Sequence, residues 1–328
     1  MRIAIDAMGG DHAPKSNVEG ALAAAELWKD TEIVLVGDQN QLEPLIDNKP
    51  ANVTIHHASE VIEGEDEPVK SVRRKKDASM VVAGRMVEEG KADAMISAGN
   101  TGALMTTGLL VVGRMEGIER PALTSMFPTV DNKGVLVLDL GANMDAKPEH
   151  LVQYALMGSL YREKLHGLDR PRVGLLNVGT EAKKGNELTK AVYPLLEEMP
   201  INFVGNVEAR DVLLGVCDVL ICDGFAGNIL LKTLEGTAGT LFSILKQEFT
   251  SSLKNKLAAA VLMPSLRGIK EKMDYKEYGG GLLIGLKGLV VKGHGSSDAT
   301  AIKNAIRQAR SAIQSGLNES ISKEISGK

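Results

Sequence analysis

Cysteine is nearly absent from this sequence. Its 328 residues include two cysteines, Cys217 and Cys222, which are too few for a disulfide framework or for the paired spacing of a structural zinc site. Both lie in the apolar run 216–222, where a buried and unreactive thiol is expected. The chain also lacks the H-E-x-x-H and G-x-S-x-G patterns, so neither a catalytic metal nor a covalent enzyme intermediate is expected.

The chain has no excess of positive charge and few aromatic residues. It carries 38 Lys and Arg against 42 Asp and Glu, a net charge of −4, and aromatic residues make up 3%. Proteins that bind nucleic acid carry basic surfaces and often stack bases on aromatic rings, so we expect no nucleic-acid partner. Any anionic partner must meet a local basic patch.

Long hydrophobic runs are also missing. No stretch approaches the roughly 20 apolar residues that span a bilayer. The chain reaches Asp6 before the apolar core of a signal peptide can form, so we expect a cytoplasmic protein. Charged residues make up 24%, which is ordinary for a globular protein of a length that buries a sizeable core.

Short apolar runs that end at Gly, Asp, Asn or His alternate with helical patterns along the chain. The runs are 3–6, 33–37, 53–57, 94–99, 135–141, 173–179, 201–205 and 219–224. This alternation predicts a single three-layer α/β/α domain over residues 1–328, with a mainly parallel sheet covered on both faces. Residues 233–275 differ, because their helical pattern predicts a protruding helical hairpin of the kind that often contacts a second subunit.

Glycine is abundant, at 35 of 328 residues, against a usual share of about 7%. Gly-Asn pairs occur at 99–100, 185–186, 205–206 and 227–228, and Gly141 and Asn143 stand close together. Glycine lets a ligand approach the backbone, and consecutive backbone N–H groups that lead into a helix bind anions. One such pair is equally well explained as a turn, but their repetition at strand ends favours an anion site.

Two nucleotide-binding patterns are excluded by spacing. Gly9 and Gly10 after the first run do not begin a G-x-G-x-x-G fingerprint. The loop 179–185 has five residues between its glycines where a P-loop has four, and the required Lys-Ser/Thr pair is absent. What remains is a glycine-flanked loop with Lys183 and Lys184, which suits a small anion.

Seven stretches together resemble one family from end to end. They are DAMGGDHAP (6–14), SAGNTGA (97–103), LDLGAN (138–143), LLNVGTEAKKGNE (175–187), FVGNVE (203–208), DGFAGNILLK (223–232) and HG (294–295). The chain resembles the PlsX phosphate acyltransferases of bacterial phospholipid synthesis. The resemblance implies transfer of a long-chain fatty acyl group from acyl carrier protein to inorganic phosphate, which forms acyl phosphate for phosphatidic acid synthesis.

The resemblance also implies a phosphotransacetylase-like fold, a homodimer, and a membrane glycerol-3-phosphate acyltransferase that accepts the product. It implies no cofactor beyond the phosphopantetheine that the carrier protein brings. Two alternatives stay open: a short-chain phosphotransacetylase-like enzyme that acts on coenzyme A thioesters, and a membrane-associated scaffold.

Attack of phosphate on a thioester needs a held phosphate, a stabilised oxyanion and an exit for the thiolate. As catalytic residues we predict Lys184, Asn228, Asn100 and His12. As substrate-binding and phosphate-binding residues we predict Asp6, Gly9, Gly10, Gly99, Thr101, Gly102, Asn143, Lys183, Gly224, Gly227, Lys232 and His294. His12 or His294 would protonate the departing sulfur, whereas the aspartates at the strand ends, Asp6, Asp11, Asp139 and Asp223, would orient loops.

Two basic groups are candidates for docking the acidic carrier protein. The first is Arg73, Arg74, Lys75 and Lys76, and the second is Lys254, Lys256, Arg267 and Lys270 on the predicted hairpin. The second group is interleaved with apolar residues, so either a peripheral membrane contact or dimer packing explains it equally well.

Overall fold

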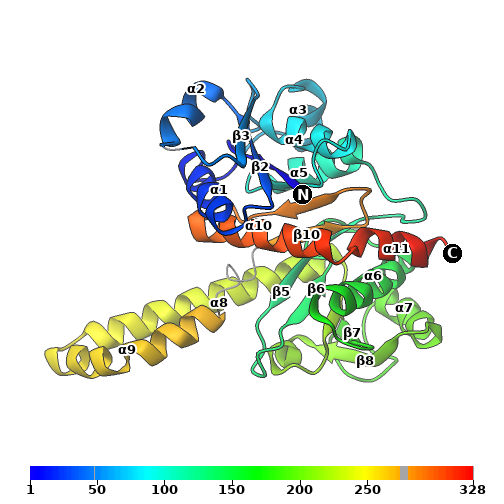
Figure 1. Ribbon diagram of the computed structural model, residues 1–328. Coiled ribbons are helices and arrows are strands. Elements are labelled where there is room, and N and C mark those ends of the chain that lie inside the picture. Colours follow the sequence, from blue (N-terminus) through cyan, green and yellow to red (C-terminus); the bar gives the residue numbers. More distant parts are fainter. Residues whose placement is uncertain (48, 274–279, 328) are drawn as a thin grey trace.

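The computed structural model describes residues 1–47, 49–273 and 280–327, and within them it leaves the side chains of Arg267 and of residues 270–273 undescribed. Helices cover both faces of a mixed, mostly parallel sheet, and a long helical hairpin projects from the body (Figure 1). The predicted α/β fold is therefore confirmed. Eleven strands of the described residues form one sheet, in the order β3-β2-β1-β4-β11-β10-β5-β6-β9-β7-β8.

The sheet consists of two parallel groups joined by two middle strands. The first group is β3 (Val53–His57), β2 (Glu32–Gly37), β1 (Arg2–Asp6), β4 (Ala94–Ser97) and β11 (Leu289–Lys292). The second group is β6 (Val135–Leu138), β9 (Val219–Ile221), β7 (Arg172–Asn177) and β8 (Asn202–Glu208). The middle strands are β10 (Gly281–Ile284) and β5 (Ala122–Phe127).

Strand direction reverses across the middle of the sheet. Antiparallel pairing occurs between β11 and β10, between β10 and β5, and between β5 and β6. Three reversals leave the second parallel group running opposite to the first. The predicted apolar runs could not reveal this, because they did not include β11, β10 or β5, and because an apolar pattern is the same in either strand direction.

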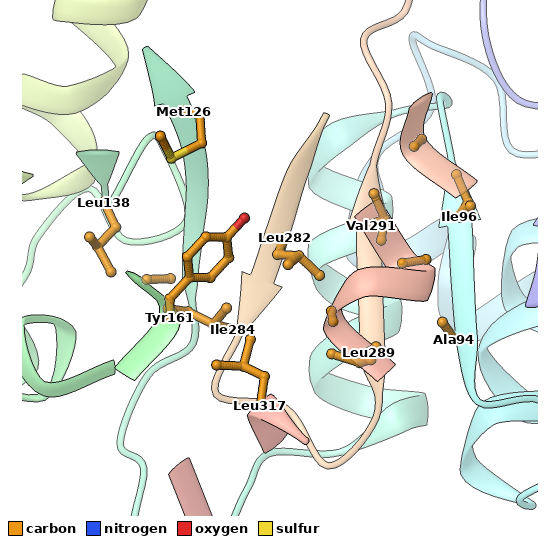
Figure 2. Close-up of a cluster of buried hydrophobic side chains, with 14 of the residues drawn as sticks. Ala94, Ile96, Met126, Leu138, Tyr161, Leu282, Ile284, Leu289, Val291 and Leu317 are labelled. Atoms are coloured by element: carbon orange, nitrogen blue, oxygen red, sulfur yellow. The ribbon is translucent and has the colours of Figure 1, made fainter. Parts of the chain in front are cut away.

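Alternating side chains supply the two faces of the core. In β1, Ile3 and Ile5 pack on one face with α1 (Lys15–Leu27) and α10 (Ala299–Gln314). Ala4 packs on the other face with α4 (Ser79–Glu88). The first of these cores runs through both halves of the sheet, as Figure 2 shows with Ile96 and Val291 on one side and Leu138 on the other. One continuous apolar layer thus joins the halves.

The remaining helices complete the layers and the connections. They are α2 (Gln39–Leu42), α3 (Pro68–Arg74), α5 (Thr101–Thr107), α6 (Pro148–His166), α7 (Glu187–Glu198) and α11 (Leu317–Ile325). Short 3₁₀ or π turns occupy Glu43–Leu45, Gly108–Val112 and Ala209–Leu214. Residues of α6, α7 and α11 lie in the same core as α1 and α10, and α5 lies with α4.

The hairpin consists of α8 (Gly224–Thr250) and α9 (Leu253–Met273), which lie side by side (Figure 1). α8 begins nine residues before the predicted projection, because Asp223 accepts a hydrogen bond from the Ala226 amide and caps the helix there. Its first turns pack on the sheet, and the rest projects. Within the described residues, no helix combines the length and apolar character needed to cross a membrane.

Candidate functional site

A pocket of about 190 Å³ lies where the two halves of the sheet meet. The first half contributes Thr101, Lys292, Gly293, His294 and Gly295. The second half contributes Leu140, Asn228, Leu231, Lys232 and Glu235, and the middle contributes Leu123, Thr124, Ser125, Gly280 and Gly281. We call this the central pocket. It draws on segments from residue 101 to residue 295, so only the fold assembles it.

Asp6 fixes the glycine loops on the first side of the central pocket. Its carboxylate is buried at the end of β1 and accepts hydrogen bonds from the hydroxyls of Ser79 and Ser97, both at 2.6 Å. The Ser97 hydroxyl in turn accepts from the Gly99 amide at 3.0 Å. Burial raises the pKa of Asp6, and these hydrogen bonds oppose the shift. Asp6 is therefore a positioning residue with no free face toward a ligand.

Gly9 and Gly99 bring these two loops into backbone contact. A Cβ atom on Gly9 would lie 2.9 Å from the Gly99 nitrogen, so a larger residue would push the loops apart. Neither glycine lines the central pocket. Both shape the pocket through the loops that they bring together. Gly10 does the same, because a Cβ atom on it would press on Ala98 and on the carbonyl of Gly295.

The side chain of Asn100 is held at both ends by hydrogen bonds. Its amide oxygen accepts from the Ala103 amide at 3.0 Å and caps α5. Its amide nitrogen donates to the carbonyls of Glu63, Gly64 and Asp66 at 3.3, 2.9 and 3.1 Å. With both ends engaged, this side chain has no donor to spare for an oxyanion. Asn100 instead ties the acidic loop 63–66 to the first turn of α5.

Asp139 fixes the loop on the second side. The carboxylate is fully buried after β6 and accepts from the amides of Leu123, Gly141, Ala142 and Asn143 at 2.6 to 3.2 Å. Burial raises the pKa of Asp139 against these hydrogen bonds. The Asn143 side chain also donates to Asp139, at 3.2 Å.

The side-chain amide of Asn143 is thus part of the structure of this loop. It also donates to the Pro121 carbonyl at 2.7 Å and to the Tyr154 hydroxyl at 2.8 Å. Asn143 does not line the central pocket, and its side chain is engaged in these internal contacts, so its role in substrate binding stays a prediction.

The first turn of α8 packs closely on this loop. The Gly224 amide donates to the Asn143 carbonyl at 2.9 Å. A Cβ atom on Gly227 would collide with the Asp139 carbonyl, so only glycine allows the helix to approach this far. This approach places Asn228 in the wall of the central pocket, half-buried, and within the described structure no hydrogen bond engages its side chain.

The two predicted histidines are separated. His294 lines the central pocket, and its Nδ1 lies 2.9 Å from the Ser296 hydroxyl. His12 is exposed in the turn before α1 and does not line the pocket. The loops of the two residues touch through the Asp11 amide, which donates to the Gly295 carbonyl at 2.8 Å.

Lys183 and Lys184 also lie outside the central pocket. Both are exposed in the loop after β7. The carbonyl of Lys184 accepts from the Asn177 side chain at 3.1 Å, which shapes the loop but does not direct the ammonium. The predicted role of Lys184 in holding phosphate stays a prediction.

The sequence reasoning missed Lys292, the last residue of β11. Its half-buried side chain lines the central pocket, and its ammonium donates to the Gly293 carbonyl. Burial lowers its pKa to about 8, and the nearby charge of Lys232 adds to the shift. The available signal was a lysine that ends an apolar run directly before Gly-His-Gly. By itself that pattern is also typical of a surface lysine.

Glu235 was missed as well. It forms an ion pair with Lys232 at 2.8 Å, and its second oxygen, Oε1, is buried without a hydrogen-bond partner among the described residues. Lys232 itself is exposed at the pocket mouth. Among the described residues, no three or more His, Cys, Asp or Glu side chains cluster so that they could hold a metal ion.

The four residues of the first basic group differ in their exposure to solvent. Arg73, Arg74 and Lys76 are exposed, whereas Lys75 is partly buried. The Lys75 ammonium pairs with Asp66 at 2.6 Å and donates to the Val61 carbonyl at 2.8 Å. Lys75 therefore stabilises the acidic loop 63–66 through these two contacts. On α9, Lys254 and Lys256 are exposed, and the side chains of Arg267 and Lys270 lie outside the described residues.

Comparison with known proteins gives a consistent result. A family model described as "Fatty acid synthesis protein" matches residues 1–320. A phosphate acyltransferase of Brevibacillus brevis is 63% identical over 326 residues, 99% of this chain and 97% of that protein. A phosphate acyltransferase of Bacillus cereus is 59% identical over 322 residues, 98% of this chain and 97% of that protein.

Two solved structures share the fold at low identity. A branched-chain phosphotransacylase from Enterococcus faecalis aligns with a TM-score of 0.61 and 17% identity, and the match covers 95% of this chain and 99% of that one. A phosphotransacetylase from Streptococcus pyogenes aligns with a TM-score of 0.59 and 16% identity, covering 96% and 94%. The predicted phosphotransacetylase-like architecture is confirmed.

Proposed function

The chain belongs to the fatty acid synthesis protein family and is a phosphate acyltransferase, and from this premise we propose that it moves a long-chain fatty acyl group from acyl carrier protein to inorganic phosphate. A phosphate oxygen attacks the thioester carbonyl, a C–O bond forms, and the C–S bond breaks. The electron pair leaves with the pantetheine sulfur as a thiolate. The products are acyl phosphate and free carrier protein.

One observation carries this proposal: the central pocket has two lysines and an asparagine side chain, which no described residue hydrogen-bonds, where loops from both halves meet. Lysine ammonium groups suit phosphate, and the Asn228 amide suits the oxyanion that develops on the carbonyl. Burial raises the pKa of the thiols, to about 12 for Cys217, so neither cysteine serves as a nucleophile at neutral pH. Direct attack by phosphate needs no acylated enzyme.

The test uses purified protein with palmitoyl-carrier protein, palmitoyl-CoA or acetyl-CoA, each with and without inorganic phosphate. We expect phosphate-dependent thiol release with palmitoyl-carrier protein and an acyl phosphate that hydroxylamine traps as the hydroxamate. Turnover of acetyl-CoA alone would favour the short-chain alternative. Thiol release without phosphate would overturn acyl transfer to phosphate, and no turnover of any donor would favour the scaffold.

We propose that the carrier protein docks on the exposed basic residues of the first group. Arg73 and Arg74 lie at the end of α3, which packs against α5. Thr101, the first residue of α5, lines the central pocket, so a carrier protein on α3 would stand beside the entrance. Opposite charges at such a contact steer association and raise affinity at low salt.

We propose that the hairpin makes the remaining contacts of the enzyme, a peripheral membrane contact and a homodimer contact. Leu253, Leu257 and Val261 are exposed at a four-residue spacing on α9 and alternate with Lys254 and Lys256. Basic and apolar residues in this arrangement suit an anionic bilayer surface. Membrane contact would bring the acyl phosphate to a membrane glycerol-3-phosphate acyltransferase.

The two surfaces serve as controls for each other. Reversing Arg73 and Arg74 to Glu is expected to raise the KM for palmitoyl-carrier protein about tenfold at low salt, with less effect at high salt. Leu257→Glu is expected to abolish flotation with anionic liposomes and leave that KM unchanged. Size-exclusion chromatography of Leu257→Glu separates membrane contact from dimer packing. An unchanged KM in the arginine variant would move the docking site elsewhere.

A further inference from the structure

The position of Lys292 is fixed by the strands on either side of it. In the sheet register it lies opposite Ser97 of β4 and opposite Gly281 of β10. A Cβ atom on Gly281 would collide with the Thr124 carbonyl, and one on Gly293 would press on Ala98, so the backbone on either side of Lys292 is closely packed. The ammonium is therefore carried by a rigid part of the fold at the wall of the central pocket.

The ammonium of Lys292 has less than its full set of partners. An ammonium donates three hydrogen bonds, and this one donates to the Gly293 carbonyl. Among the described residues, no carboxylate lies within the 4.0 Å of a salt bridge with it. A charge removed from water is costly unless it is paired. Lys292 is thus a half-buried cation that faces the central pocket and, as far as the described residues go, lacks a counter-ion.

The other charged groups around the pocket do not supply that counter-ion. Asp6 and Asp11 favour the charged form of Lys292 from a distance, but the Asp6 carboxylate is already held by two serine hydroxyls. On α8, Glu235 is paired with Lys232. His294, in the loop before α10, faces the same pocket. The uncompensated charge in the pocket is positive.

We propose that Lys292 is a catalytic residue that binds the attacking phosphate, an inference that rests on the acyl transfer proposed above. Its ammonium would hold a phosphate oxygen on the side of the first half of the sheet. Asn228, on the side of the second half, would meet the acyl carbonyl, so nucleophile and electrophile enter from opposite walls. As the C–O bond forms and the C–S bond breaks, Lys292 keeps its proton and its charge.

This role gives the reaction a defined dependence on pH. The pKa of Lys292 is lowered to about 8, so the ammonium is charged below that pH and loses its proton as the pH rises through it. Phosphate binding should therefore weaken above about pH 8, by up to about tenfold for each further pH unit. An arginine in its place would stay charged over this range.

The first test compares Lys292→Met with Lys287→Met, an exposed lysine in the turn between β10 and β11 that lies outside the central pocket. We expect Lys292→Met to raise the KM for inorganic phosphate about 10- to 100-fold, the cost of one charge-assisted hydrogen bond. The KM for palmitoyl-carrier protein should stay within about twofold of the wild-type value. Lys287→Met should match the wild type in both constants. An unchanged phosphate KM in folded Lys292→Met would overturn the proposal.

The second test does not depend on Lys292→Met folding. In Lys292→Arg the phosphate KM should stay nearly level from about pH 7 to pH 9.5, whereas in the wild type it should rise. An identical rise in both proteins would remove Lys292 from phosphate binding.

A binding experiment separates this proposal from the proposed function. Inorganic phosphate should shift the NMR signal of one ¹³C-dimethylated lysine, and that signal should be missing from Lys292→Met. Such a shift in a protein that forms no acyl phosphate would support the phosphate site and reject the acyl transfer. Acyl transfer with no phosphate-dependent shift of the Lys292 signal would support the proposed function and reject the phosphate site at Lys292.

Discussion

The two halves of the sheet each bury one aspartate at the end of a central strand, but they bind it by different means. Asp6 in the first half accepts from hydroxyls that belong to α4 and β4, Ser79 and Ser97. Asp139 in the second half accepts mainly from backbone amides of its own loop, such as Gly141 and Ala142. The first aspartate joins separate elements through side chains, whereas the second mainly closes its own loop and connects it to Leu123 of β5.

This difference decides which hydrogen bonds to each aspartate a single substitution can remove. The hydroxyl partners of Asp6 are 73 and 91 residues away in sequence, and each is deleted by a single Ser→Ala change. The backbone amides that bind Asp139 remain whatever the side chains are. Losing the Asp139 carboxylate therefore leaves several buried donors without an acceptor at once, and each unsatisfied donor adds its own desolvation cost.

The largest expected effect follows from Asp139→Ala. The change leaves the amides of Leu123, Gly141, Ala142 and Asn143 without their acceptor, and we expect a loss of about 4 kcal/mol in the free energy of unfolding. Urea unfolding measures it, with exposed Asp145→Ala as the control. A loss below about 1 kcal/mol would mean that water or a shifted loop satisfies these amides.

A smaller effect is expected on the Asp6 side. Ser79→Ala and Ser97→Ala should each cost about 1 to 2 kcal/mol, since each removes one hydrogen bond to a buried carboxylate. Because the two hydroxyls share one carboxylate, the double variant should differ from the sum of the single ones by about 1 kcal/mol in a double-mutant cycle. Strict additivity would show that Asp6 does not couple α4 to β4.

The smallest expected effect is on the pH dependence of the free energy of unfolding. Burial raises the pKa of Asp6 in the folded protein, so its contribution to stability is fully present below the unfolded pKa and is lost as pH rises through the folded pKa. The stability difference between wild type and Asp6→Asn should thus favour the wild type more at about pH 4 than at pH 7. Urea unfolding at both values measures it, and a change of opposite sign would contradict a raised pKa.

Several features of the pocket could be predicted from local sequence. Thr101, Asn228, Lys232 and His294 stand in glycine-rich loops or the helix starts beside them, and all four line the central pocket. They were found because glycine next to a polar residue at a strand end marks a place where the backbone can meet a ligand.

Other features depended on contacts that a local pattern does not contain. Asn100 and Asn228 each follow a glycine at the start of a helix. The side-chain amide of Asn100 donates to the Gly64 carbonyl, 36 residues away. The side chain of Asn228 lines the central pocket and has no hydrogen-bond partner in the described part of the chain. Lys292 and Lys184 are likewise both lysines beside a glycine, but only Lys292 is enclosed by neighbouring strands.

By itself the sequence determined eight of the eleven strands in the described residues and the loops that glycine makes approachable, because these follow from apolar periodicity and backbone freedom within a few residues. The predicted runs did not include β5, β10 or β11. The tertiary structure alone decided that the two parallel groups run in opposite directions and meet at the central pocket. It also decided which polar groups there have partners. Desolvation and hydrogen-bond satisfaction depend on residues tens to hundreds of positions away, and no short stretch of chain records them.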